Sequence, residues 1–215
     1  MIHYHEWLNS WRYYCSIASE FENTIQYVDD AVGDDGKLSN GNTFSNEFYK
    51  ILFRAASEFE NVGKMICSDI DGKNCEKYNM PSISKCILGK YPKITSTQLY
   101  TPNEISLKPL NNWITKEQGG SLSIEGIEWW KAYNSLKHGR YMNIEKANFQ
   151  NCFNAISSLL VMELYAGRMT LNEAFKFEIS TNISKYFKYD YYRDLIFPHP
   201  QKLPDESLFE MMNKT

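Results

Sequence analysis

The sequence lacks the features that mark several common protein classes. Its five cysteines are odd in number and include no Cys-x-x-Cys pair, so neither a disulfide framework nor a zinc-finger pattern is indicated. The longest apolar run, around residues 159–162, is too short to span a bilayer, and no signal-type segment opens the chain. We therefore expect reduced thiols and a soluble, cytoplasmic protein without membrane contact, metal or cofactor.

Two further absences limit the classes of function that the sequence indicates. The formal net charge is −3, so the chain has no overall basic field, and binding to nucleic acid would require a local basic patch. The sequence also has no glycine-rich phosphate loop, serine-nucleophile elbow or kinase pattern. What it does contain is 43% hydrophobic and 15% aromatic residues, enough to build a packed core.

Apolar side chains recur at every third or fourth position over most of the chain, which predicts amphipathic helices. Thr43 or Ser45 can cap the second of these helices, and Asn143 can cap the fourth. The predicted helices cover residues 4–28, 43–68, 123–138, 143–167 and 170–187.

The pattern changes within an insertion at about residues 73–120. A short helix is predicted in PSISKCILGKYP, then a small β-hairpin with its turn near Pro102 and Asn103, then a loop at Gly119 and Gly120. We expect a mainly α fold in which residues 1–187 form a single domain, a bundle of four to five long helices with a small β-hairpin insertion. Residues 188–215 are expected to form a C-terminal arm.

The hexapeptide ASEFEN occurs twice, at residues 18–23 and 56–61. We interpret it as two amphipathic helices with similar surfaces, and a remnant of duplication is the alternative. Its glutamates are typical of carboxylate-bridged metal centres, but those also use Glu-x-x-His pairs, and the sequence contains none.

The stretch WWKAYNSLKHGRY, residues 129–141, holds the most informative polar side chains. On a helix, Trp129, Ala132 and Leu136 share one face. Asn134 and His138 lie one turn apart on the opposite side. The histidine therefore faces either solvent or a partner.

Two interpretations of this pair remain open. In the structural one, Asn134 and His138 satisfy local hydrogen bonds near a helix end, where a histidine also interacts favourably with the helix dipole. In the functional one, His138 acts as a general acid or base oriented by Asn134, and Lys137 and Arg140 hold a phosphate.

The motif Asn134-Ser-Leu-Lys-His138, placed on a bundle helix that precedes a long apolar helix, resembles the HEPN superfamily. The resemblance covers roughly residues 45–70 and 124–166. It implies an all-α bundle, usually a homodimer, in which two Arg-polar-x-x-x-His motifs form a metal-independent RNA-cleaving site. It also implies that His138 is the catalytic or RNA-contacting residue, supported by Asn134. Such proteins often act in toxin–antitoxin or antiphage systems.

The chain departs from this family pattern at one position. The family's arginine is replaced by Tyr133, a neutral phenol that cannot bind phosphate as a bidentate cation. Lys137 and Arg140 can supply the charge from other angles, so we assign these three residues to RNA or phosphate contact. Two hypotheses follow. One is an RNA-cleaving or RNA-binding effector with a cognate antitoxin or regulatory protein, and the other is a non-catalytic dimerisation or partner-binding module.

Overall fold

The computed structural model describes residues 1–32, 38–101, 106–172, 174 and 188–189. This part of the chain is mainly helical and carries small antiparallel strand pairs, as the sequence predicted. The α-helices are α1 (Tyr4–Ile25), α2 (Asn46–Asp71), α3 (Met80–Lys90), α4 (Glu128–Asn143) and α5 (Phe149–Met169). The strands are β1 (Leu99–Tyr100), β2 (Ser106–Leu107), β3 (Ile114–Gln118), β4 (Ser121–Glu125) and β5 (Lys188–Tyr189).

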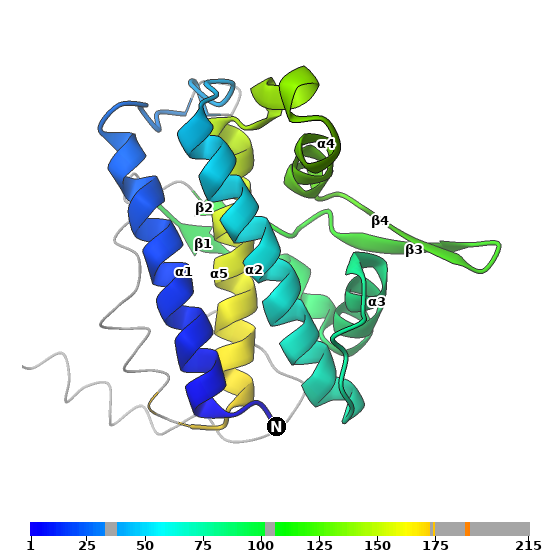
Figure 1. Ribbon diagram of the computed structural model, residues 1–215. Coiled ribbons are helices and arrows are strands. Elements are labelled where there is room, and N and C mark those ends of the chain that lie inside the picture. Colours follow the sequence, from blue (N-terminus) through cyan, green and yellow to red (C-terminus); the bar gives the residue numbers. More distant parts are fainter. Residues whose placement is uncertain (33–37, 102–105, 173, 175–187, 190–215) are drawn as a thin grey trace, which may run out of the picture.

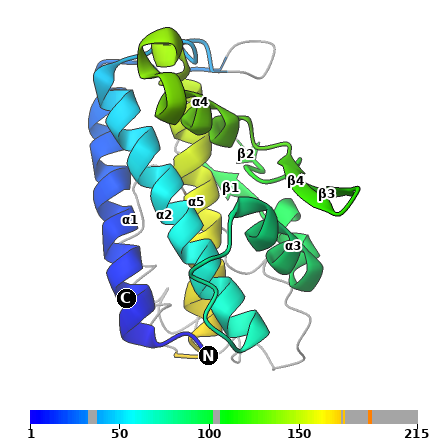
Figure 2. The ribbon, with the colours of Figure 1, turned by 45° about the vertical axis from the view of Figure 1, so that its right-hand side comes forward.

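Helices α1, α2 and α5 stand side by side as the main bundle, with α3 and α4 packed beside them (Figures 1 and 2). α5 is buried along nearly its whole length, which explains its almost continuous apolar sequence. At its first turn the Phe149 ring meets Phe21 of α1 at 5.3 Å and Phe48 of α2 at 5.6 Å between ring centroids. Aromatic side chains thus join the three long helices in one core.

The predicted N-cap of α2 is confirmed. The Ser45 hydroxyl accepts a hydrogen bond from the Phe48 main-chain N–H at 3.0 Å, as an N-cap does. Gly72 ends the helix with a φ of 64°, a left-handed conformation that glycine adopts without strain. The long helices α1 and α2 therefore lie within a few residues of their predicted bounds.

The segment between α2 and α4 contains the predicted short helix, which is α3, and the predicted strand pair. β1 and β2 are antiparallel with Leu99 opposite Leu107, and β5 pairs with the other edge of β1. A 3-10 turn, Pro92–Ser96, connects α3 to β1.

A second hairpin, β3–β4, was missed by the sequence analysis. The loop expected at Gly119 and Gly120 is its turn, and both glycines have positive φ. The start predicted for the next helix, residue 123, lies inside β4, so that prediction was wrong. In β4, Leu122 and Ile124 alternate with exposed serines, and this period of two outweighs the helical spacing. Figure 1 shows the hairpin projecting from the bundle beside α3.

The connection from α4 to α5 also differs from the prediction. Asn143 is the last residue of α4, and a 3-10 turn, Ile144–Lys146, follows it. Asn148 caps α5 instead, by accepting a hydrogen bond from the Asn151 N–H at 2.9 Å. Most of the helix predicted at 170–187, and the arm predicted at 188–215 except the two residues of β5, lie outside the described residues.

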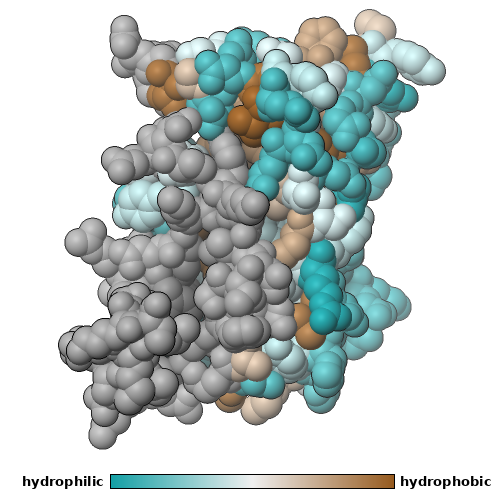
Figure 3. Space-filling view, turned by 90° about the vertical axis from the view of Figure 1, so that its left-hand side faces the viewer, coloured by the Kyte–Doolittle hydropathy of each residue, from teal (hydrophilic) through white to brown (hydrophobic). Residues whose placement is uncertain are grey.

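The described surface on the α1 side is mostly hydrophilic, with hydrophobic patches towards the upper end (Figure 3). Five cysteines are free thiols. Among the described helices, none is both long enough and apolar enough to cross a bilayer.

Candidate functional site

Buried aromatic side chains fix the orientation of α4, which carries most of the residues predicted to form the site. The Trp129 indole N–H donates to the Ser158 hydroxyl of α5 at 3.1 Å. The same ring meets Phe59 of α2 edge-on, with 5.0 Å between the ring centroids. Ala132 and Leu136, on the predicted inner face, are also buried. These contacts leave the opposite face of α4 directed outward.

The outward face presents Asn134 and His138. His138 is exposed and Asn134 is half-buried, one turn earlier on the same helix. Within the described part of the chain, neither side chain has a hydrogen-bond or ion-pair partner in the same molecule. The structural interpretation, in which both satisfy local hydrogen bonds, therefore has no support there. Both ring nitrogens of His138 remain available to a ligand.

Tyr133 lies apart from this pair. It is buried, and its ring packs edge-on against Phe53 of α2, with 4.9 Å between the centroids, and at a tilt against Trp130, with 5.1 Å between the centroids. The Lys137 ammonium lies 5.7 Å from the same ring, within the range of a cation–π contact. Tyr133 thus belongs to the seam between α2 and α4, and its ring supports Lys137.

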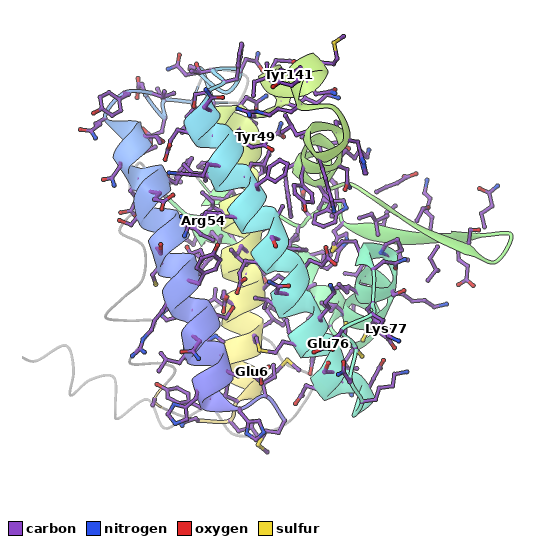
Figure 4. The ribbon with its side chains drawn as sticks, viewed as in Figure 1. Glu6, Tyr49, Arg54, Glu76, Lys77 and Tyr141 are labelled. Atoms are coloured by element: carbon purple, nitrogen blue, oxygen red, sulfur yellow. The ribbon has the colours of Figure 1, made fainter. Side chains whose placement is uncertain are left out.

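Arg140 is held in place by the first turns of α2. Its Nη2 donates to Asn46 Oδ1 at 2.7 Å, and its guanidinium carbon lies 4.5 Å from the centre of the Tyr49 ring. Stacking on a phenol ring orients the planar guanidinium while leaving its other N–H donors available. In Figure 4, Tyr49 lies on the part of α2 that faces α4.

A break in α4 separates His138 from Arg140. Gly139 has non-helical dihedral angles, φ −165° and ψ 64°, so the chain turns directly after the histidine. Asn143 stabilises the turn, because its Nδ2 donates to the Gly139 carbonyl at 2.8 Å and, more weakly, to the Ser135 carbonyl at 3.4 Å. The Asn143 side-chain oxygen accepts a hydrogen bond from Lys146 at 2.7 Å.

The structure therefore brings the predicted residues together only in part. Lys137, His138 and Arg140 lie at the exposed end of α4 beside Asn134, while Tyr133 turns inward. The sequence analysis missed Asn46 and Tyr49, which hold Arg140 in place. Asn46 lies 94 residues before Arg140 in the sequence. It also missed the two exposed apolar residues that follow Arg140, Tyr141 and Met142, which are 93% and 85% exposed.

No group of three or more metal-binding side chains comes together among the described residues. Comparisons with family models, with curated proteins and with solved structures return no match for this chain. Any functional assignment therefore rests on the residues of the chain and their geometry.

Proposed function

We propose that this protein is an RNA-binding effector of the HEPN type, in which His138 catalyses cleavage of the RNA backbone. The observation that carries the proposal is the outer end of α4, residues 134–142, where the unpartnered imidazole of His138 shares an exposed helix end with the cations of Lys137 and Arg140. His138 and Lys137 are exposed, and Arg140 stacks on Tyr49. An RNA backbone offers phosphates to such cations, and its bases offer flat faces to stack on exposed rings such as Tyr141.

The chemistry would be general acid–base catalysis by imidazole. Neutral His138 takes the proton from a ribose 2′-hydroxyl, the 2′-oxygen bonds to phosphorus, and the bond from phosphorus to the 5′-oxygen breaks. The 5′-oxygen gains a proton from a general acid, either the second His138 of a homodimer or water, and the product ends in a 2′,3′-cyclic phosphate. Lys137 and Arg140 stabilise the added negative charge on the phosphate oxygens.

The resemblance to HEPN proteins adds a partner to this scheme. One imidazole can serve as the base or as the acid at a given step, and a homodimer would supply a second His138. Toxin–antitoxin or antiphage action, with a cognate antitoxin or regulatory protein, is the biological setting that the resemblance implies.

A second candidate function has its own supporting observation. Tyr133 stands where the family has an arginine, and its burial against Phe53 and Trp130 removes that position from the exposed face. A HEPN-like bundle without the arginine would serve as a dimerisation or partner-binding module, with the outer end of α4 as its contact surface.

The test is RNA cleavage by the purified protein without divalent metal, beside a His138→Ala variant. We expect cleavage to fall at least about a hundredfold in the variant, the usual contribution of a general acid or base. His5→Ala is the matched control, because His5 is also an exposed histidine of a helix, α1, and belongs to no part of the candidate site.

The ends of the products separate the two functions. Cyclic phosphate ends that disappear with His138→Ala but persist with His5→Ala support the nuclease. Two results would contradict cleavage at this site and favour the binding module. In one, the folded protein binds RNA without cutting it. In the other, the His138→Ala variant cuts RNA as well as the wild type does.

A further inference from the structure

A largely buried polar cluster joins the three long helices and contains no residue of α4. It consists of Ser10 on α1, Glu58 on α2 and Glu163 on α5. The Ser10 hydroxyl oxygen lies 2.6 Å from Glu58 Oε1 and 2.6 Å from Glu163 Oε1. Both distances are typical of a hydrogen bond between a hydroxyl and a carboxylate, about 2.5–2.7 Å.

The number of hydrogen atoms available to this cluster determines its protonation state. A serine hydroxyl has one hydrogen and can donate it to only one of the two carboxylates. If both glutamates were ionised, the second contact would hold two oxygen atoms together at 2.6 Å with no hydrogen between them. A proton on one carboxyl removes this conflict, because that carboxyl then donates to the serine, and the serine donates to the other.

Burial indicates which glutamate holds the proton. Glu163 is fully buried, and its Oε2 has no hydrogen-bond partner among the described residues. Glu58 is 9% exposed and its Oε2 accepts a further hydrogen bond from the Asn61 amide at 3.2 Å. Asn61 and Ser10 can therefore both donate to a charged Glu58, whereas Glu163 has less compensation for a charge.

We infer that a proton-binding site is formed by Glu163, Ser10 and Glu58. In this site the protonated carboxyl of Glu163 donates a hydrogen bond to Ser10, and Ser10 donates one to the Glu58 carboxylate. Release of the proton from Glu163 then loosens the contact of α1 and α2 with α5. Burial is the largest influence on the pKa of Glu163, the negative charge of Glu58 acts in the same direction, and together the influences around this carboxyl raise its pKa to about 8. Hydrogen bonds from Ser10 and Trp7 act in the opposite direction and lower it.

Among the described residues, the other charged groups around the cluster offer no compensating cation. A pocket of about 340 Å³ between α1 and α2 reaches Ser10 and Glu58 from outside, and its remaining titratable groups are Glu6 and Tyr13. Arg54, one turn before Glu58 on α2, is already engaged by Glu20 and lies over the Tyr13 ring. In Figure 4, Glu6 lies near the lower end of the bundle and Arg54 higher up. The pocket provides the route by which water can exchange the proton.

The direction of the pH effect follows from the two protonation states. Unfolded Glu163 loses its proton near the ordinary value of 4.5, whereas the folded protein keeps it until about pH 8. Between these values only the folded state binds the proton, so the unfolding equilibrium constant rises by up to about tenfold for each pH unit. Below the window both states are protonated, and above it neither is.

The experiment compares the whole chain with Glu163→Gln, whose amide can donate to Ser10 as a neutral carboxyl does. Infrared spectra of the wild type at pH 6 should contain the carbonyl band of a protonated carboxyl, which Glu163→Gln removes. Denaturation between pH 5 and 8 should show wild-type stability falling relative to the variant, by up to about a thousandfold in the unfolding constant. Glu60→Gln is the control, because Glu60 is a half-buried glutamate of α2 that is paired with Lys64.

Two outcomes would overturn the inference: a wild-type spectrum without this band at pH 6, or identical pH profiles for wild type and Glu163→Gln. Glu58→Gln provides an independent test that keeps Glu163 in place. Removing the charge of Glu58 should make the protonated band disappear at a lower pH than in the wild type. An unchanged midpoint would show that the two carboxyls do not share the proton.

Discussion

At the scale of single residues, the contrast between Arg140 and Tyr133 decides how the outer end of α4 works. A guanidinium that stacks on Tyr49 and bonds to Asn46 is already oriented, so an RNA phosphate that binds it orders little additional structure. The buried ring of Tyr133 contributes packing and a surface for Lys137. Charge at this site thus comes from positions on either side of His138, four and seven residues after Tyr133.

We predict that Arg140→Ala weakens binding to single-stranded RNA and lowers the salt dependence of binding by about one phosphate contact, a change of about 0.7 in the logarithmic slope. Arg12→Ala on α1 removes the same charge from an exposed position outside the site and should leave the slope unchanged. Binding isotherms at several salt concentrations measure both. Equal effects of the two substitutions would indicate a general charge effect and would contradict a contact at Arg140.

At the scale of elements, the start of α4 depends on one glycine. Gly126 joins β4 to the helix with a φ of 83°, and a Cβ atom there would lie 1.6 Å from the main-chain oxygen of Asn112. We predict that Gly126→Ala destabilises the protein by more than about 3 kcal/mol, because both the dihedral angle and the contact are unfavourable. Gly89→Ala, near the exposed end of α3 with open space around it, should stabilise by up to about 1 kcal/mol. Denaturant titration of both variants provides the comparison, and equal stabilities would refute the role of Gly126.

The elements also show which features could be predicted from the sequence. α1 followed from one continuous apolar stripe, and α2 from such a stripe and its N-cap Ser45, because these signals are local. The start of α4 and the cap of α5 were misplaced where competing signals overlap, as at Leu122 and Asn143. The link from Arg140 to Asn46 and the cluster around Ser10 join distant segments, which no local period reveals. Glu163 did leave a signal, a single carboxyl within the apolar run of α5.

At the scale of the whole molecule, the distribution of burial predicts where the fold opens first. α5 packs against α1, α2 and α4 and is almost fully buried, so its amides should exchange hydrogen only when the bundle unfolds. Among the described strands, β3 and β4 pair only with each other and expose most of their residues, and a two-stranded hairpin has little stability of its own. Hydrogen exchange followed by mass spectrometry should therefore show slow exchange over residues 149–169 and fast exchange over 114–125.

Because His138 lies on a helix, α4, whose inner face packs against this slowly exchanging core, peptides of the first part of α4, residues 129–136, should also exchange slowly. Fast exchange there would mean that α4 detaches from the bundle, and the site would then not be preorganised for RNA.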